Sequence, residues 1–319
     1  MIKFAIVGTG IIATRHIDSI NAIDGVELAA VCDINEEKAK QCSESCGVPY
    51  TLDYKELPSK FDFDAVILNL PHFLHCEATE FFLNAGKHVL VEKPMATTVE
   101  ECERMIEASK RSGKKLGIAH IQRHFNSISA VKQIYDSGEL GKLCMYNENR
   151  STNYFYDERP RWFLSKKTAG GGIAMNFAAH SFDKLLSVMS GAKITSIDAQ
   201  CGNLVNDYDI EGHAQIFAKF DNGVSAAITL FGYLASGYEA YYYFTKGILK
   251  VVGDTLEINR GDGLGFVPYP ITFDKLPFAR QIEEFRKFID GESSKTPGGE
   301  YGAYIIDTIQ TIYEKSDRA

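Results

Sequence analysis

The fold of the N-terminal part is decided by residues 4–13, which read FAIVGTGIIA. Four apolar residues lead straight into a glycine-rich turn, which is typical of a buried strand followed by a helix. Gly8 permits a tight turn, Gly10 lets the backbone approach a ligand phosphate, and Ala13 allows the helix to pack closely on the strand. The stretch therefore has the GxGxxA form of a dinucleotide-binding turn, in the strand-turn-helix context that such a turn requires.

A helix that begins after this turn presents free backbone N–H groups, here those of Ile11 and Ile12, to a bound anion. Asp33 ends the second apolar run, 20 residues after the turn, where a carboxylate can accept both ribose hydroxyls. Its alternative role is to cap the next helix, which Asn35 can also do. A carboxylate at this point repels the 2′-phosphate of NADP, and neither of the next two residues is an arginine. The sequence therefore predicts a site for NAD, with NADP disfavoured.

Short apolar runs alternate with helical periodicity through the first 120 residues. Runs that are apolar on both faces belong to a parallel sheet covered by helices. The best-marked helix begins at Thr98, has Glu101 in position for a capping box, and ends at Gly113. The alternation predicts an α/β, doubly wound Rossmann domain over residues 1–120. The apolar runs are residues 4–7, 28–32, 65–70, 89–91 and 116–119.

The pattern changes after residue 120. Helices are expected near residues 127–137 and 182–189, and β signals then follow one another with short turns such as Asp-Asn-Gly at 221–223. We predict an α+β domain over residues 121–319, with a large, open, mainly antiparallel sheet arranged as a meander and two closing helices. An open sheet with an apolar outer face favours a homodimer or homotetramer. The expected strands are residues 143–149, 194–201, 213–220, 224–231, 240–244, 249–252 and 256–258.

The 319 residues have an ordinary globular composition, with 45% hydrophobic and 24% charged residues. There are 34 lysines and arginines against 42 acidic residues, a net charge of −8, and no basic block suits a nucleic acid or an anionic membrane. No apolar run approaches the roughly 18 residues that a membrane span needs. The expected partner is a small molecule.

The seven cysteines lack CxxC spacing, which indicates reduced thiols in a cytoplasmic protein. Cys42 and Cys46 are four residues apart on an expected helix and could share a metal, but no histidine lies near them in the sequence. Small buried apolar residues explain this pair better. No metal site is predicted.

Three further stretches make the sequence recognisable: NLPHFLH at 69–75, AGKHVLVEKP at 85–94 and GGGIAMNFAAHSFD at 170–183. With the glycine-rich turn, they make the chain resemble the glucose-fructose oxidoreductase and inositol dehydrogenase family, also called Gfo/Idh/MocA. The resemblance covers nearly the whole length. It implies an NAD-dependent dehydrogenase that transfers a hydride between the nicotinamide and a secondary alcohol or ketone of a sugar, polyol or sugar derivative.

By this resemblance Lys93, in the Glu-Lys-Pro motif, is the proton-transfer group beside the nicotinamide. Oxidation of an alcohol needs a base for the hydroxyl proton, and a base works best with a pKa near the operating pH. Burial at a strand end and the positive nicotinamide would both lower the pKa of a lysine there. The alternative is a solvated lysine at a strand end. The residues implied to line the cofactor site are Asn69, Pro71, His75 and Glu92.

Asn176, His180 and Asp183 share one face if they lie on one helix, and this face is expected to meet Lys93 across a domain cleft. The family commonly has aspartate where Asn176 stands and uses it with the histidine to bind substrate hydroxyls. Asparagine still forms hydrogen bonds but brings no charge to keep an ammonium protonated. The role of His180 therefore stays open between substrate anchor, proton relay, main acid/base and structural histidine.

Gln122 and Arg123 resemble the family's cleft segment, and residues 159–162 resemble a loop that the family often places over the cofactor. Arginines in these segments could bind a phosphate or a carboxylate of the substrate. We therefore predict Gln122 and Trp162 at the cofactor and Arg123 at the substrate.

Two other functions stay open. A non-catalytic binding or regulatory protein that senses a dinucleotide would keep the fold and lose turnover. The presence of Lys93 and His180 argues against a non-catalytic function, whereas Asn176 is compatible with it. The other is a dehydrogenase or reductase for a ring compound that is not a sugar, because a fold does not determine a substrate.

Overall fold

The computed structural model describes residues 1–205, 207–272 and 275–316 of the chain, which folds into two units. The first unit contains residues 1–121 and 275–306, and the second contains residues 122–274 and 307–319. Residues 275–306 therefore lie in the first unit, whereas the sequence analysis assigned them to the second domain.

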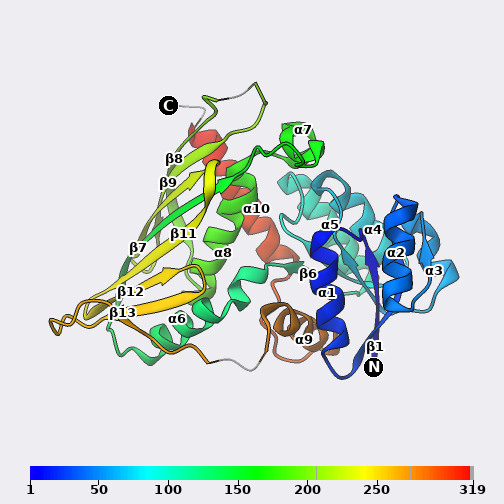
Figure 1. The fold of residues 1–319 in the computed structure, drawn as a ribbon, viewed down its shortest axis with the longest axis horizontal. Helices are drawn as coiled ribbons and strands as arrows, with labels where there is room; N and C mark the ends of the chain where they lie inside the picture. The colour runs from blue at the N-terminus through cyan, green and yellow to red at the C-terminus, as the bar shows by residue number, and fades with distance from the viewer. Residues whose placement is uncertain (206, 273–274, 317–319) are drawn as a thin grey trace. The chain divides into compact units, whose positions relative to one another are not determined.

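A six-stranded parallel sheet forms the centre of the first unit (Figure 1). Its strand order is β3-β2-β1-β4-β5-β6, so the order changes direction between β1 and β4. All of β4 and the central residues of β5 are buried, as expected for strands covered on both faces. This confirms the predicted doubly wound fold. The strands are β1 Ile2–Val7, β2 Val26–Cys32, β3 Tyr50–Thr51, β4 Ala65–Leu68, β5 His88–Glu92 and β6 Leu116–Ala119.

The helices between these strands begin at caps that the sequence predicts. Asn35 Oδ1 accepts a hydrogen bond from the Lys38 N–H (3.0 Å), and Thr98 Oγ1 accepts one from the Glu101 N–H (3.2 Å). The Glu101 carboxylate accepts in turn from the backbone N–H of Thr97 (2.9 Å), one residue before the position that a capping box predicts. The helices are α1 Ile11–Asn21, α2 Glu36–Cys46, α3 Leu57–Lys60, α4 His75–Asn84 and α5 Val99–Ser112, with short 3₁₀ turns η1 Tyr54–Glu56 and η2 His72–Leu74.

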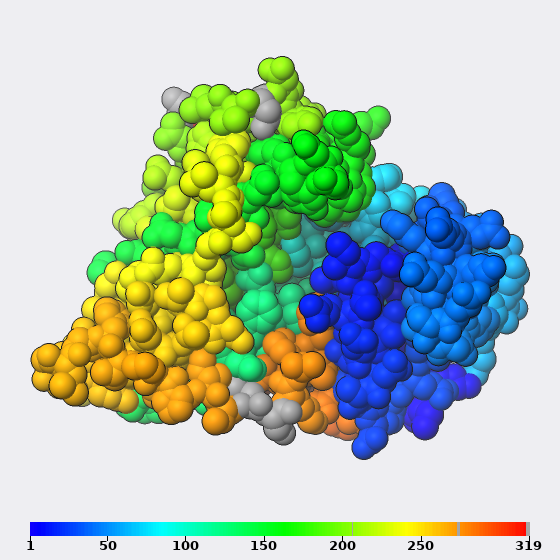
Figure 2. All heavy atoms as spheres, viewed as in Figure 1, coloured from blue at the N-terminus to red at the C-terminus, as the bar shows by residue number. Residues whose placement is uncertain are grey.

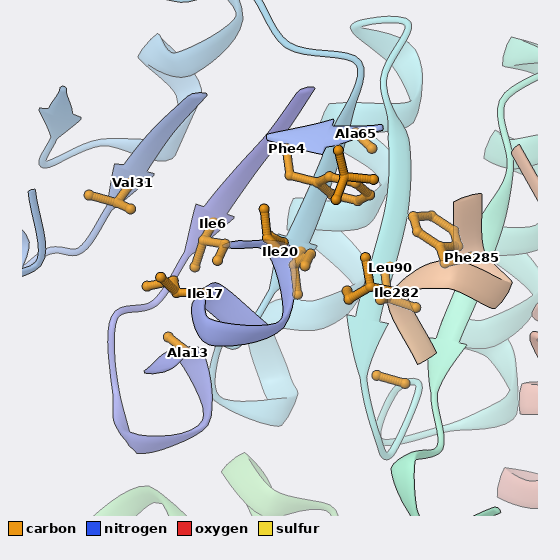
Figure 3. Close-up of a cluster of buried hydrophobic side chains, with 13 residues drawn as sticks. Phe4, Ile6, Ala13, Ile17, Ile20, Val31, Ala65, Leu90, Ile282 and Phe285 are labelled. Carbon is orange, nitrogen blue, oxygen red and sulfur yellow. The ribbon is translucent and has the colours of Figure 1, made fainter. Parts of the chain in front are cut away.

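Helix α9 (Pro277–Asp290) explains why residues 275–306 belong to the first unit. Its Ile282 and Phe285 are fully buried in the same apolar cluster as Phe4 and Ile20, and Figure 3 shows them beside Leu90. The rings of Phe4 and Phe285 lie 6.2 Å apart between centroids. Helical periodicity reveals that a helix has an apolar face but not which surface covers it, so the sequence could not predict this partner.

The second unit is built on an eight-stranded sheet in the order β14-β13-β12-β11-β7-β10-β9-β8. The predicted open, mainly antiparallel sheet is confirmed, but the simple meander is wrong. β7 lies between β10 and β11, parallel to β10 and antiparallel to β11. β10 and β11 are separated in the chain only by Gly232, yet they lie on opposite sides of β7. The strands are β7 Leu143–Asn153, β8 Ile194–Gly202, β9 His213–Phe220, β10 Ser225–Phe231, β11 Tyr233–Phe244, β12 Gly247–Val252, β13 Thr255–Asn259 and β14 Val267–Pro268.

Helix α8 (Ala179–Val188) is buried along most of its length and is joined to β7 by polar side chains. Glu148 of β7 accepts hydrogen bonds from Ser181 Oγ (2.7 Å) and Lys184 Nζ (3.2 Å), and from the hydroxyl of Tyr146. Burial lowers the pKa of Lys184 to about 8. The other helical elements here are η3 Ile121–His124, α6 Asn126–Ser137, η4 Arg161–Leu164, α7 Lys166–Ala169, a π-helical turn η5 Ala174–Ala178, and α10 Gly299–Ser316, which begins in the first unit.

The buried lysine predicts how stability changes with pH. Unfolded Lys184 has a pKa near 10.5, so between about pH 8 and 10 the unfolded chain binds a proton that the folded chain has lost. The free energy of unfolding should therefore rise with pH in this window, by up to about 1.4 kcal/mol per pH unit, relative to the Glu148→Gln/Lys184→Met double variant. Urea unfolding of the wild type and the double variant from pH 7.5 to 9.5 measures this difference. If the free energies of unfolding of the two proteins change with pH in parallel, the prediction is contradicted.

The opposite face of this sheet carries large exposed apolar side chains. Met145, Phe217, Phe231 and Val252 are each more than a third exposed, and the strand register places them on the same face. Tyr146 and Glu148, on the other face, are buried. The apolar outer face that the sequence analysis expected is therefore present.

Candidate functional site

The turn after β1 has the geometry that a dinucleotide needs. Gly8 has φ of +87°, and a Cβ built on it would lie 2.4 Å from the carbonyl oxygen of Asn69, so only glycine fits. Gly10 is the N-cap residue of α1, and a Cβ built on it would have no neighbouring atom within 4 Å. The first N–H groups of α1, including those of Ile11 and Ile12, have no acceptor within the helix and lie beside this open space.

Asp33 is held in a defined orientation at the end of β2. Its Oδ2 accepts hydrogen bonds from the backbone N–H (2.8 Å) and Oγ1 (3.0 Å) of Thr9, and its Oδ1 accepts one from the backbone N–H of Asn35 (2.9 Å). The side chain that caps α2 is Asn35, which removes the alternative role of Asp33 as the cap. The carboxylate thus lies directly beside the glycine-rich turn, which fits a ribose contact.

The loop after β4 joins the glycine-rich turn through Asn69. Its Nδ2 donates to the carbonyl of Gly8 (3.3 Å), while its Oδ1 is buried and has no hydrogen-bond partner among the described residues. A buried acceptor without a donor is a feature that a bound ligand can satisfy. Pro71 follows in the same loop, immediately before η2.

His75 supports this loop from a buried position. It has no exposed surface, and its Nε2 and Nδ1 lie 2.8 Å and 2.9 Å from the carbonyl oxygens of Leu70 and Pro94. Burial is the largest influence on its pKa and lowers it. His75 therefore ties the loop after β4 to the turn after β5, and a direct contact with the cofactor stays a prediction.

The Glu-Lys-Pro motif follows β5 in the first unit, where Lys93 is half-buried. Glu92 Oε2 accepts from the backbone N–H of Lys93 (3.2 Å), and Glu92 Oε1 lies 3.0 Å from Nε2 of His16. His16 belongs to α1, has no exposed surface, and packs edge-on against Phe278 at 5.1 Å. This pair joins the dinucleotide helix to the turn that carries Lys93.

Sequence reasoning missed His16, although a signal was present. It lies within the apolar stripe of α1 formed by Ala13, Ile17 and Ile20, all of which are buried. A polar residue on such a stripe needs a buried partner. The partner, Glu92, could not be identified from the sequence because it lies 76 residues away, at the end of β5.

In the second unit, Asn176 lies in the π-helical turn that precedes α8, and His180 lies in the first turn of α8. Both are largely buried, and the Asn176 side chain lies close enough to the hydroxyl of Tyr154 to lower its pKa. The sequence analysis placed both residues on one face only on the condition that they lie on one helix. A π-helical turn contains an extra residue and is frequent at functional sites, and its sequence has no mark that separates it from an α-helix.

Arg123 has a partner that the sequence analysis did not foresee. Its Nε lies 3.1 Å from Oδ1 and 3.3 Å from Oδ2 of Asp183, its Nη2 also contacts Oδ1, and Asp183 has no exposed surface. The charge of Arg123 is thus paired with a carboxylate of the protein, and its role at the substrate stays a prediction. The neighbouring Gln122 accepts a hydrogen bond from Nη1 of Arg150 (3.2 Å), whose guanidinium lies 4.0 Å from the ring centre of Phe177. Trp162 lies in η4 and stacks on Phe163.

Two of the three glycines at 170–172 are required by residues that the sequence analysis did not single out. A Cβ on Gly171 would lie 1.9 Å from the Tyr313 hydroxyl oxygen, and one on Gly172 would lie 2.1 Å from the carbonyl oxygen of Glu211. The buried carboxylate of Glu211 accepts from the N–H groups of Gly172 (2.9 Å) and Ala174 (2.7 Å) and from the Tyr313 hydroxyl (2.8 Å). Glu211 therefore fixes the turn that leads to Asn176, and burial raises its pKa.

The cysteines and acidic residues in the described part of the chain form no metal centre. Among these residues, no group of three or more His, Cys, Asp or Glu side chains is arranged to hold a metal ion, and all seven cysteines are free thiols. No described helix is both long enough and apolar enough to cross a membrane.

The sequence matches both domains of one known family. Residues 2–120 match the oxidoreductase family with an NAD-binding Rossmann fold, and residues 128–255 match a Gfo/Idh/MocA C-terminal domain. The chain belongs to the Gfo/Idh/MocA family of oxidoreductases, as the motifs predicted.

Two curated relatives and one solved structure show how similar this chain is to individual known proteins. The 1-carboxy-3-chloro-3,4-dihydroxycyclohexa-1,5-diene dehydrogenase of Comamonas testosteroni is 36% identical over 182 residues, which are 57% of this chain and 45% of that protein. The match thus spans less than half of that relative. The 1,5-anhydro-D-fructose reductase of Ensifer adhaerens is 25% identical over 97% of this chain and 94% of that protein. The aldose-aldose oxidoreductase from Caulobacter crescentus, solved with glycerol, shares the fold, with a TM-score of 0.91 at 24% identity over 99% of this chain and 98% of that one.

Proposed function

We propose that the chain catalyses NAD-dependent hydride transfer between the nicotinamide and a secondary alcohol or ketone of a sugar, polyol or related ring compound. The observation that carries this proposal is the position of two turns in the first unit. The glycine-rich turn follows β1 and the Glu-Lys-Pro turn follows β5, and only β4 separates these parallel strands. Ligands of open α/β sheets bind at this carboxyl edge, where the strand order changes direction.

The residues of the turn would hold the cofactor in a defined way. Gly8 permits the tight turn, Gly10 leaves space for the pyrophosphate, the N–H groups of Ile11 and Ile12 would bind it, and Asp33 would accept the ribose hydroxyls. Bound NAD supplies the hydride acceptor. Four further residues would contact the cofactor: Asn69, Pro71, Gln122 and Trp162.

Lys93 would transfer the proton. Its free amine would take the hydroxyl proton during oxidation, and its ammonium would return that proton during reduction. Glu92 holds the backbone of Lys93 through a hydrogen bond of 3.2 Å, which would orient the side chain. Asn176 and His180 would bind and orient the substrate hydroxyl.

The names of the two curated relatives support this reaction class. One is named a dehydrogenase of a dihydroxycyclohexadiene and the other a reductase of an anhydro sugar. A panel of polyols, aldoses, sugar acids and sugar phosphates, followed by NADH absorbance, tests the proposal. NAD binding without turnover of any compound would favour the dinucleotide sensor, the candidate that the neutral Asn176 keeps open.

Cofactor choice follows from Asp33. We expect NAD to bind at least about tenfold more tightly than NADP, equivalent to ~1.4 kcal/mol, because the carboxylate repels the 2′-phosphate. Asp33→Ala should remove most of this preference, whereas Asn35→Ala, which removes only the cap of α2, should keep it. Fluorescence titration with NADH and NADPH measures both. Equal affinities in the wild type, or a preference that survives Asp33→Ala, would remove Asp33 from the ribose site.

The apolar outer face of the eight-stranded sheet would bind a second copy of the chain in a homodimer or homotetramer. Four large apolar side chains on this face support the proposal: Met145, Phe217, Phe231 and Val252. Light scattering of the purified protein determines the number of copies. Cytoplasmic localisation stays a prediction from the cysteine content.

A further inference from the structure

Arg159 lies against several aromatic side chains in the segment before η4. Its guanidinium carbon is 3.8 Å from the ring centre of Tyr154, 4.1 Å from that of Phe163 and 5.6 Å from that of Tyr156. Rings that pack on the face of a guanidinium fix its plane and leave its edge, with the N–H donors, free for other contacts. The segment and α7 form part of the surface in Figure 2, where they are green.

The positive charge of Arg159 has no compensating carboxylate. Among the residues that the structure describes, no Asp or Glu side chain lies within ion-pair distance of it, in contrast to Arg123, which is bound by Asp183. The Nε atom of Arg159 is buried and donates to no described acceptor. Buried donors without acceptors are rare in folded proteins, and a charged one needs an explanation. An anionic oxygen from a ligand would supply both the missing acceptor and the missing charge.

Tyr154 connects Arg159 to the candidate substrate site. Its hydroxyl donates a hydrogen bond to the carbonyl oxygen of Gly172 (3.3 Å), and the side chains of both Arg159 and Asn176 lie close enough to this hydroxyl to lower its pKa. Burial raises the pKa of Tyr154 to about 12, so the hydroxyl is neutral at physiological pH and leaves the arginine charge uncompensated. The guanidinium therefore lies one side chain away from the amide that we propose to bind a substrate hydroxyl.

We propose that Arg159 binds a carboxylate or phosphate group of the substrate, so that the substrate is an acidic sugar or polyol and not a neutral one. This inference rests on the proposed function, because it takes Asn176 as a residue that binds the substrate. The donors of a guanidinium edge match two oxygens of such an anion. The neutral Asn176 suits this ligand, because an aspartate at that position would repel a neighbouring anion.

Calorimetric titration of the NADH-bound full chain tests this inference without turnover. The ligands are matched pairs that differ in one acidic group: D-glucuronate with D-glucose, D-galacturonate with D-galactose, and myo-inositol 1-phosphate with myo-inositol. We expect at least one acidic member to bind at least about tenfold more tightly than its neutral partner. Arg159→Gln should remove this difference, and Arg159→Lys, which keeps the charge but not the planar edge, should keep part of it.

Lys167→Gln is the matched control, because it removes an exposed positive charge from the same region and should leave the difference unchanged. NADH affinity is measured for every variant, which also reports folding. If Arg159→Gln weakens NADH and leaves the preference for acids, Arg159 binds a cofactor phosphate and the inference is overturned. It is also overturned if no acid binds more tightly than its partner. Acids that bind through Arg159 but never turn over would instead refute the proposed reaction and leave the acidic ligand in place.

Discussion

Replacement of Lys93 by Met is expected to lower kcat by roughly 10²- to 10⁴-fold with little change in NAD affinity. Methionine keeps most of the length of the side chain and removes the group that accepts the hydroxyl proton. The backbone contacts of the turn do not depend on the amine, because Glu92 binds the Lys93 N–H and His75 lies against the Pro94 carbonyl. Steady-state kinetics with a substrate from the panel and titration with NADH separate the two effects.

Lys55→Met is a suitable control for this experiment. Lys55 is about half exposed and forms a surface ion pair with Glu77, so its loss should change neither kcat nor cofactor binding. If Lys93→Met keeps a tenth or more of the wild-type kcat, another group transfers the proton. His180 would then be the first residue to test, because the sequence already left its role open.

The second large effect concerns stability. Arg123→Met should reduce the free energy of unfolding by about 3–5 kcal/mol, because it leaves the carboxylate of Asp183 buried without its partner. Asp183 has no exposed surface and Arg123 is only 13% exposed, so water cannot replace the lost contact. Urea unfolding measures the change, with the mutant and the wild type compared at the same pH.

Two further variants show whether the buried charge is the cause. The Arg123→Met/Asp183→Leu double variant removes both charges and should recover most of the stability. Arg104→Met breaks the exposed pair with Glu80 and should cost less than about 1 kcal/mol. A loss of under about 1 kcal/mol for Arg123→Met itself would contradict the buried-charge explanation and favour the predicted role of this arginine at the substrate.

Sequence patterns predicted the parts of this protein that depend on neighbouring residues. The apolar runs became β1, β2, β4, β5 and β6, and Asn35 and Thr98 became helix caps, because burial and capping follow from local spacing. The dinucleotide turn was equally clear, since its glycines meet local demands on the backbone.

The missed features all involve partners that are distant in the sequence. His16 pairs with Glu92, Arg123 with Asp183, and Glu211 with the turn at 170–174. Each residue alone resembles many other polar residues, and only the folded chain brings its partner within hydrogen-bond distance. The pairing of Arg123 with Asp183 could therefore not be predicted from either residue alone.

The position of α9 in the first unit has a consequence for the synthesis of the protein. Ile282 and Phe285 complete a core to which Phe4 and Ile20 also contribute, so this core cannot close until the ribosome has made almost the whole chain. At a translation rate of about 5–20 residues per second, the apolar face of α1 stays without its packing partner α9 for on the order of 15–50 s. A gene fragment that ends at residue 120 would encode every strand of the Rossmann sheet and still lack part of its hydrophobic core.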